Sequence, residues 1–398
     1  MTAQGTCDQR FAQVSEEFDR NLGERGEVGA SVCVIVDGEV VVDLWGGEAA
    51  PGVPWLNDTI GHVWSCTKGA TALCAHLLAQ RGELDLNAPV TRYWPEYGTR
   101  GKEGTLVRHL LTHQAGLPAL RTPLPPGAFY DWKLMADALA GEEPFWTPGT
   151  MHGYHGLTFG YLVGEVVRRV SGRSLGTFFR EEIAEPLGLE FWLGLPEEQE
   201  RRVAPTIQAD PPPAMPSFYV NAFSDPASMA ALLIGNTGGY MNPGESDTRD
   251  AHAAEYGAVG GITNARGLAG MYRPLSLGGD GLVSPQQLAI MSLTQSAATD
   301  AVLAVPSRFA LGFMKAVDNN HLPEADREGA HLTETAFGHA GMGGSVGFCD
   351  PAARLAFGYT MNKQGAGLGI NPRGQALVDA TYRTLGYQQA YGGIWYIS

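Results

Sequence analysis

Ser65 and Lys68 stand three residues apart at the start of an apolar helical pattern, and this spacing suits nucleophilic catalysis. A hydroxyl group is a poor nucleophile until a neighbouring base removes its proton. Positions i and i+3 lie on one face of a helix, so the lysine amine can reach the serine hydroxyl. A serine in the first turn would also lie near free N–H groups at the positive end of the helix dipole. The pair can equally be an N-cap serine followed by a solvated lysine, so other motifs must decide.

Three further segments accompany this pair. Tyr154 stands five residues after a Pro-Gly turn and just before a strongly amphipathic helical pattern at 157–170. Residues 107–117 read V-R-H-L-L-T-H-Q-A-G-L, and residues 337–345 read F-G-H-A-G-M-G-G-S ahead of a predicted strand hairpin. Four motifs in a fixed order are far more specific than any one of them.

In this order the motifs resemble those of the serine β-lactamase-like superfamily, specifically its class C-like branch and the family VIII carboxylesterases. The first matches S-x-x-K, and 107–117 match L-L-T-H-x-S-G-L with Ala115 in place of the serine. Tyr154 matches the tyrosine of a Y-x-N motif, and 337–345 stand where the superfamily carries K-T-G or a variant. The resemblance covers roughly residues 30–362.

The resemblance implies an α/β (α+β) fold, in which an antiparallel sheet flanked by helices lies beside an all-helical domain with the active site between them. It assigns Ser65 as the nucleophile, with Lys68 and Tyr154 as its catalytic partners. It places the backbone N–H groups of Ser65 and Met342 in an oxyanion hole. The expected substrate-binding residues are His339, Gly341, Trp146 and Tyr130.

The chemistry of the Lys68 and Tyr154 pair is coherent without the family. Both side chains have ordinary pKa values near 10, too high for an efficient base at neutral pH. Close together, the ammonium favours the phenolate, and burial disfavours a lone ammonium. A shared proton can then pass from Ser65 to the leaving alkoxide, and the same pair can activate the water that hydrolyses the acyl-enzyme. Which of the two is the formal base stays open, because a coupled pair titrates as a unit.

Two departures from the superfamily motifs bear on the substrate. Gly156 replaces the asparagine of Y-x-N, and His339 replaces the lysine of K-T-G. Those two side chains hold the amide and carboxylate of a lactam, whereas a small uncharged ester needs neither. We therefore predict a carboxylesterase for short-chain esters. The alternatives are a β-lactamase, a D-alanyl-D-alanine peptidase, an acyltransferase and, from another class, a non-catalytic binding protein.

The elements that must position these residues follow from the hydrophobic pattern. Strands are predicted at 30–36 and 39–45 around an Asp-Gly hairpin turn, and near the carboxyl end at 308–316, 344–348 and 354–361. Helices are predicted at 11–22, 65–80, 107–111, 157–170, 175–187 and 378–385. Strands at both ends around a helical middle predict a discontinuous α/β domain from 1–90 and 255–398, with a mainly helical domain at 91–254.

Composition excludes several partners. The chain has 27 basic and 42 acidic residues, a net charge of −15, and no Lys/Arg-rich run, which argues against nucleic acid and anionic membranes. No apolar run reaches the ~20 residues of a membrane helix. Five cysteines without a C-x-x-C pair and an amino terminus without an apolar signal core predict a cytoplasmic protein with reduced thiols. The composition does not indicate the oligomeric state.

Two other sequence motifs suggest a different nucleophile and a zinc site. Ser345 lies in a G-x-S-x-G sequence, which in α/β-hydrolases marks a nucleophile between a strand and a helix, but a hairpin is predicted to follow it. His109 and His113 have the spacing of a zinc-binding helix, but Leu110 replaces the required glutamate. We therefore expect no metal and no organic cofactor.

Overall fold

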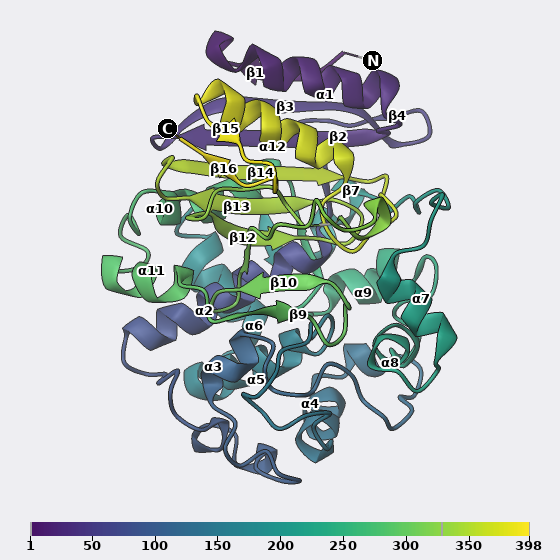
Figure 1. The fold of residues 1–398 in the computed structure, drawn as a ribbon, viewed down its shortest axis with the longest axis vertical. Coiled ribbons are helices and arrows are strands. Elements are labelled where there is room, and N and C mark those ends of the chain that lie inside the picture. The colour runs from purple at the N-terminus through teal and green to yellow at the C-terminus, as the bar shows by residue number, and fades with distance from the viewer. Residues whose placement is uncertain (1, 328, 398) are drawn as a thin grey trace.

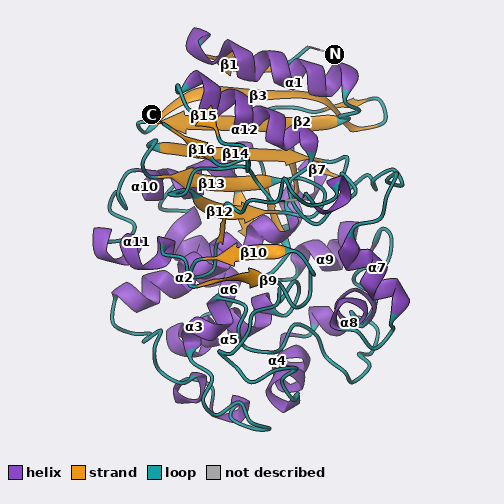
Figure 2. Ribbon diagram, viewed as in Figure 1, coloured by secondary structure: helices purple, strands orange, loops and turns teal. Residues whose placement is uncertain are grey.

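Antiparallel strands occupy one end of the molecule and helices fill the other (Figures 1 and 2). The computed structural model describes residues 2–327 and 329–397, and within them ten strands form one sheet in the order β1-β3-β2-β14-β13-β12-β11-β10-β9, with β4 paired to β3. Its strands are β1 (Gln4–Cys7), β2 (Gly29–Val36), β3 (Glu39–Ala50), β4 (Val53–Pro54), β9 (Ser296–Thr299), β10 (Pro306–Phe309), β11 (Met314–Lys315), β12 (Phe337–Ala340), β13 (Val346–Asp350) and β14 (Leu355–Met361). Their neighbours are antiparallel throughout, as the resemblance implied.

The β2–β3 hairpin is confirmed at the predicted turn. Asp37 and Gly38 have φ values of 54° and 86°, the left-handed conformations that a two-residue hairpin requires. β14 lies on the other side of β2, with Tyr359 opposite Val32. Segments from the two ends of the chain therefore share the middle of one sheet.

Helices cover both faces of this sheet. One layer consists of α1 (Ala12–Glu24) and α12 (Pro372–Thr384), whose apolar side chains share a core with β2, β13 and β14. The opposite face carries α2 (Thr67–Gln80) and α10 (Ala265–Ser276), in the core that also fills the helical end. Because α2 packs between sheet and helices, its first turn lies where the two parts meet.

The remaining helices build the other end of the molecule. They are α3 (Val107–Leu111), α4 (Trp132–Gly141), α5 (Phe159–Ser171), α6 (Leu175–Phe179) with its continuation η6 (Arg180–Ala184), α7 (Ser217–Ser224), α8 (Met229–Gly235), α9 (Arg249–Ala253) and α11 (Pro285–Ser292). A small sheet in the order β6-β8-β5-β7 joins Phe191–Leu193 and Val203–Ala204 to Ile60–His62 and Gly261–Thr263. It pairs strands on both sides of the predicted boundaries at 90 and 255, and the two-domain division stays a prediction.

Several predicted elements have other bounds than expected, and three of them show the physical reason. The run at 308–316 is two short strands, because Gly312 turns the chain with a φ of 89° beneath Ala72. The last helix begins at Pro372, capped by Asn371, six residues before the predicted start, since its first turn is polar and gives no apolar signal. The first helix runs past Gly23 and ends at Glu24, and Gly26 rather than Gly23 is left-handed.

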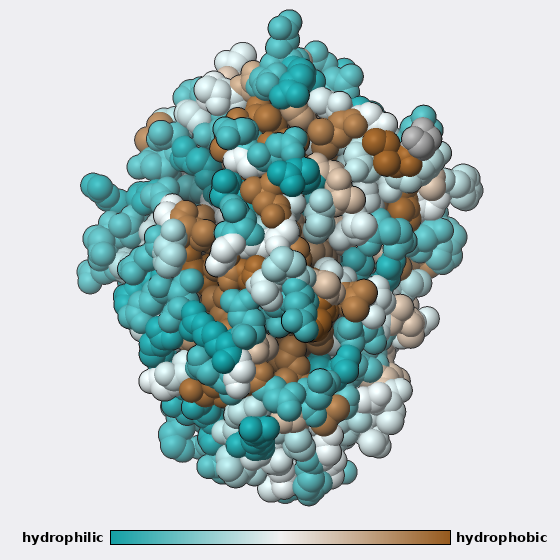
Figure 3. All heavy atoms as spheres, turned by 90° about the vertical axis from the view of Figure 1, so that its left-hand side faces the viewer, coloured by the Kyte–Doolittle hydropathy of each residue, from teal (hydrophilic) through white to brown (hydrophobic). Residues whose placement is uncertain are grey.

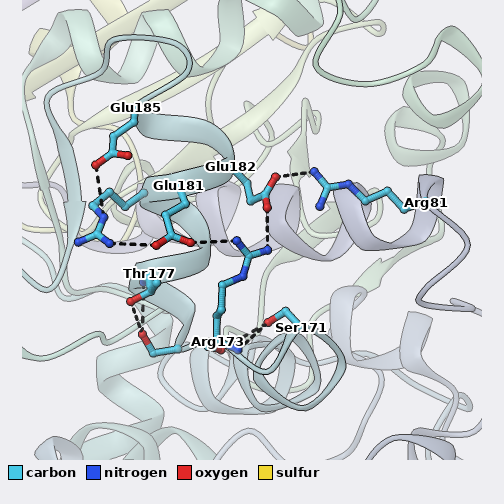
Figure 4. Close-up of polar contacts among 9 residues, drawn as sticks. Arg81, Ser171, Arg173, Thr177, Glu181, Glu182 and Glu185 are labelled. Carbon is cyan, nitrogen blue, oxygen red and sulfur yellow. Dashed lines mark hydrogen bonds and ion pairs between the residues drawn. The ribbon is translucent and has the colours of Figure 1, made fainter.

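An ion-pair network fastens the far end of α2 to the α6–η6 helix (Figure 4). Glu182 accepts from Arg81 at 2.5 Å and from Arg173 at 2.7 Å, and Arg173 also contacts Glu181 at 3.0 Å. The network is partly exposed, and it fixes α2 at the end opposite to the S-x-x-K motif.

Apolar side chains gather in the middle of the face drawn in Figure 3, at the height where the sheet meets the helices. Within residues 2–327 and 329–397, no helix has both the length and the apolar character needed to cross a membrane.

Candidate active site

Ser65 lies at the junction between strand β5 (Ile60–His62) and helix α2. A short 3₁₀ turn, Trp64–Cys66, precedes α2, and Trp64 has a φ of 48°, a left-handed conformation that costs a non-glycine residue energy. The Thr67 hydroxyl donates to the Trp64 carbonyl and accepts from the N–H of Gly261 at 2.8 Å, which holds the turn in place. Ser65 thereby lies at the wall of a cavity. Only 7% of its surface is exposed.

Lys68 reaches the Ser65 hydroxyl as the i, i+3 spacing predicts. Its Nζ lies 2.9 Å from Ser65 Oγ, 2.7 Å from the carbonyl oxygen of Gly156 and 3.0 Å from that of Ala258. The side chain is fully buried, and this burial lowers the pKa of Lys68 well below its ordinary value. Carbonyl oxygens only accept, so a neutral amine would donate to Gly156 and Ala258 and turn its lone pair to the hydroxyl of Ser65.

Tyr154 completes the group. Lys68 Nζ lies 4.9 Å from the centre of the Tyr154 ring, and the ring stacks on Phe309. Burial raises the pKa of Tyr154, and a polar contact with Ser65 lowers it by less. The phenol therefore keeps its proton at neutral pH and can give it to a leaving group. The structure thus brings together Ser65, Lys68 and Tyr154.

Two buried side chains hold the Tyr154 segment: Asp300, which the sequence did not indicate, and His113 of the 107–117 motif. The Asp300 carboxylate accepts from the backbone N–H of Tyr154 at 2.9 Å. His113 Nδ1 accepts from the N–H of His155 at 3.1 Å, and the ring of His113 packs against Tyr154. Burial lowers the pKa of His113 well below its ordinary value, so this ring is a neutral acceptor. No spacing rule links a lone aspartate to a tyrosine so far away along the chain.

Met342 lies in the turn between β12 and β13 and lines the same cavity as Ser65. The turn is closed by the N–H of Gly341, which donates to the Ser345 carbonyl at 2.7 Å. Among the backbone hydrogen bonds of the described residues, none uses the N–H of Ser65 or of Met342 as donor. The oxyanion hole made by these two N–H groups stays a prediction.

His339 and Gly341 lie beside these residues. The His339 ring is 6.1 Å from that of Tyr154, its Nδ1 contacts the Ala340 carbonyl at 2.7 Å, and its Nε2 is buried without a partner. Burial lowers the pKa of His339 to about 3, so the ring is neutral. Gly341 is required by space, because a Cβ there would lie 2.3 Å from the Val63 carbonyl oxygen.

Two predicted substrate contacts are not brought to the cavity. Tyr130 donates to Glu245 at 2.6 Å and faces a separate hollow between α4 and α5. Trp146 packs edge-on against His155 behind the Tyr154 segment. The structure therefore brings neither side chain to the cavity beside Ser65.

The competing nucleophile is also placed away from the cavity. Ser345 is fully buried, its hydroxyl donates to the Val63 carbonyl at 3.0 Å, and strand β13 rather than a helix follows it. Ser345 therefore supports the turn that carries Met342. Within residues 2–327 and 329–397, no cluster of three or more His, Cys, Asp or Glu side chains has the arrangement of a metal site.

A cavity of about 330 Å³ opens beside Ser65, and a narrower one of about 90 Å³ adjoins it. The larger is lined by Trp64, Ser65, Tyr154, Gly156, Leu157, Phe218, Tyr219, Leu233, Ile234, Gly235, Met241, Val259, Leu303, Met342 and Leu368. None of these carries a Lys, Arg, His, Asp or Glu side chain. Four residues line both cavities: Tyr154, Phe218, Leu303 and Leu368.

The family model named Beta-lactamase matches residues 11–380, and the chain belongs to this family. It is thus a serine hydrolase with the β-lactamase-like fold that the four motifs predicted. The sheet, the flanking helices and the S-x-x-K turn at the start of α2 are the features that define this class.

Individual relatives include esterases. The chain is 35% identical over 378 residues to the esterase/β-lactamase LipL of Mycobacterium tuberculosis, covering 90% of this chain and 82% of LipL. A crystal structure of a family VIII carboxylesterase superposes with a TM-score of 0.84 at 35% identity, over 96% of this chain and all of the other. EstA from Arthrobacter nitroguajacolicus Rue61a gives a TM-score of 0.82 at 32% identity, over 97% and 99% of the two chains.

Proposed function

We propose that the protein is a carboxylesterase that hydrolyses small, uncharged, short-chain esters through an acyl-enzyme on Ser65. The observation that carries the proposal is the Ser65–Lys68–Gly156 geometry at the wall of a cavity without charged side chains. Among its relatives, LipL and EstB of Burkholderia gladioli bear esterase names, and the latter is 32% identical over 222 residues.

The proposed reaction begins when the Lys68 amine takes the proton of Ser65 and Oγ attacks the ester carbonyl carbon. The N–H groups of Ser65 and Met342 stabilise the oxyanion, a contribution worth about 3–4 kcal/mol for one such donor. The Tyr154 phenol gives its proton to the departing alkoxide and recovers one from Lys68, which leaves an acyl-enzyme. Water then enters, loses a proton to the same pair and attacks the acyl carbon. The bond from this carbon to Ser65 Oγ breaks, Oγ takes the proton back from the pair, and the acid is released.

The substrate class follows from what surrounds the reacting atoms. His339 stays neutral because its pKa is about 3, so a substrate carboxylate finds no cation there. Gly156 offers only its carbonyl, which Lys68 already occupies at 2.7 Å. A missing hydrogen bond to a charged group costs roughly 1.5–3 kcal/mol, or one to two decades in rate. Neutral esters avoid both losses.

The narrower cavity supports a short acyl group. Its volume of about 90 Å³ is much smaller than the volume of about 330 Å³ of the cavity beside Ser65. Apolar side chains dominate its lining, among them Leu303, Val305, Val346, Phe348 and Leu368, and Arg308, Lys315, Asp326 and His339 also line it. We assign the acyl chain to this cavity and the alcohol to the larger one.

The five thiols carry no disulfide, and we retain the cytoplasm as the expected compartment.

The test compares three substrates and one variant. We expect kcat/KM for a neutral butyrate ester to exceed that for a chromogenic cephalosporin and for a D-alanyl-D-alanine peptide. Ser65→Ala should lose at least ~10³-fold in kcat. Intact-mass detection of a phosphonyl adduct on the wild type, absent from Ser65→Ala but present on Ser345→Ala, locates the nucleophile.

Each outcome has a consequence. Near-normal turnover of Ser65→Ala contradicts the acyl-enzyme on Ser65. A preference for either lactam or peptide replaces the esterase proposal by β-lactamase or peptidase activity. Product partitioning towards esters when alcohols are added indicates an acyltransferase. Absence of both adduct and turnover indicates a binding protein.

A further inference from the structure

Tyr154 lies in a stretch, residues 151–155, that is neither helix nor strand. The backbone of such a segment has no ladder of hydrogen bonds of its own. The position of the phenol therefore depends on what else holds the peptide groups on either side of it. The side chains that supply these contacts, those of Lys68, His113, Asp300 and Ser307, are all buried.

One set of anchors comes from the helical side. The N–H of Gly153 donates to the His113 carbonyl at 3.1 Å, and the N–H of His155 donates to Nδ1 of the same histidine. Farther along, the Gly156 carbonyl accepts from Lys68. These contacts fix the neighbours of Tyr154 but leave its own N–H to another partner.

That partner is Asp300, which is 1% exposed and has every oxygen engaged. Its Oδ1 accepts from three backbone N–H groups at 2.9 Å each, those of Tyr154, Val302 and Leu303. Its Oδ2 accepts from the Ser307 hydroxyl at 3.0 Å. The carboxylate is thus fixed by its own turn and extends one acceptor to the Tyr154 segment.

The same turn holds the segment at a second point. His152 Nε2 lies 2.8 Å from Ser307 Oγ, and the N–H of Ala301 donates to the His152 carbonyl at 3.2 Å. Three hydrogen bonds therefore join residues 152–154 to residues 300–307: Tyr154 N–H to Asp300, His152 to Ser307, and Ala301 N–H to the His152 carbonyl. Burying a carboxylate costs free energy of desolvation, and each hydrogen bond that is misdirected leaves part of the charge unpaired. This cost is consistent with a role in which the position of the segment matters.

We infer that Asp300 is a positioning residue that sets the place of the Tyr154 phenol by fixing its backbone N–H. The inference rests on the proposed catalytic role of Tyr154. A misplacement of about 1 Å at a reacting group can cost ~10²-fold in rate. Geometry and not charge is the property that Asp300 supplies, so a neutral acceptor of the same shape should serve.

The test uses Asp300→Ala, Asp300→Asn and Asp300→Glu. We expect Asp300→Ala to lower kcat ~10²-fold with KM within ~3-fold of wild type. Asp300→Asn keeps the acceptor for the three N–H groups, and the Ser307 hydroxyl can rotate to accept from its amide, so kcat should stay within ~5-fold. Asp300→Glu keeps the charge but displaces the oxygens, and it should be slower than Asp300→Asn.

Asp350 provides the matched control. It is a fully buried carboxylate that accepts from Thr333 and Thr335 at 2.6 Å and from Tyr382 at 3.0 Å, on the other face of the sheet from α2. Asp350→Ala should lower the unfolding temperature while kcat, measured where the variant is folded, stays within ~2-fold. An equal loss of kcat in both alanine variants contradicts a specific role for Asp300.

A double-mutant cycle with Tyr154→Phe separates positioning from general damage. Once the hydroxyl is gone, its placement no longer matters, so adding Asp300→Ala should cost less than ~3-fold more. The rate of Ser65 phosphonylation, followed by intact mass, serves as readout where turnover is too slow. The same fold-loss in both backgrounds overturns the inference. Normal turnover of Tyr154→Phe alone instead contradicts the proposed function, and Asp300→Glu outperforming Asp300→Asn assigns the effect to charge.

Discussion

Lys68 is surrounded by oxygen acceptors and apolar groups, and in the part of the chain that the structure describes it forms no ion pair with a carboxylate. A lysine in such a place loses its proton more easily, because burial penalises the ammonium and no counter-ion restores it. The proposed base thus needs no histidine. Its proximity to Tyr154, whose pKa is raised, places a proton acceptor and a proton donor on either side of one serine.

Lys68→Ala and Tyr154→Phe should each lower kcat by at least ~10³-fold, because both act on the same proton. The double variant should be little worse than either single variant, and the kcat values of all four proteins measure this. Losses that multiply in the double variant would show that the two side chains act independently. The pH dependence has a predicted direction: kcat/KM should fall as the pH is lowered, because Lys68 then gains a proton and can no longer act as the base.

At this scale the sequence predicted three side chains that the structure brings together and missed the support from Asp300. Ser65, Lys68 and Tyr154 stand in motifs whose spacing reflects one helix face or one turn. Asp300 contacts the Tyr154 backbone from 146 residues along the chain, and only tertiary structure creates that contact. The hydrophobic periodicity of the sequence therefore does not predict the contacts of Asp300.

Helix α2 is the element that connects the site with the rest of the molecule. Lys68 lies in its first turn, directly after the 3₁₀ turn that carries Ser65, and Arg81 at its C-terminal end belongs to the ion-pair network with Arg173 and Glu182. Both ends of the helix are therefore fixed, one by the Thr67 contacts and the other by charges. Side-chain exposures of 22–37% for these three charged residues imply strong solvent screening.

Arg173→Ala removes the cation that bridges Glu181 and Glu182. We expect a loss of about 1 kcal/mol in the free energy of unfolding, or roughly 1–3 °C in the unfolding temperature. The difference should shrink at high salt, and kcat at 25 °C should not change. Calorimetry at two salt concentrations measures this. Arg180→Ala, which removes longer contacts of 3.2 and 3.4 Å, serves as the control with a smaller effect.

Elements with a strong local signal were predicted well. The hairpin at Asp37 and Gly38 has its turn where two left-handed residues are needed. The predicted strand at 308–316 was wrong, because Gly312 turns where a Cβ would lie 2.3 Å from that of Ala72, and packing against α2 gives no local signature. Elements fixed by tertiary approach are thus the ones that pattern alone does not reveal.

Across the whole molecule, a buried carboxylate joins layers far from the site. Glu27 hydrogen-bonds to the Tyr359 hydroxyl in β14 and lies 3.3 Å from Arg373 in α12. Burial raises the pKa of Glu27 to about 7, and Arg373 and Tyr359 lower it by less. The folded protein therefore holds a proton on Glu27 over a range where the unfolded chain has released it.

The free energy of unfolding should consequently fall as pH rises from about 5 through 7, since the native state binds more protons there. The contribution is fully present below the ordinary carboxyl pKa and is lost above the raised value. Glu27→Gln should remove this slope, while Glu48→Gln, at a half-buried position in β3 of the same sheet, should keep it. Denaturant unfolding at several pH values measures both, and an unchanged slope in Glu27→Gln would contradict the assignment.

The position of β14 also governs the order in which the protein can be made. β14 pairs with β2 on one side and with β13 on the other, so residues about 330 positions apart must meet before the sheet is continuous. During synthesis the β2–β3 hairpin therefore waits with an open, apolar edge until nearly the whole chain has been translated. Helices α3 to α6 are assembled from nearer neighbours and can fold earlier. The sheet is the slow, aggregation-exposed half, and refolding should be limited by the arrival of its last central strand.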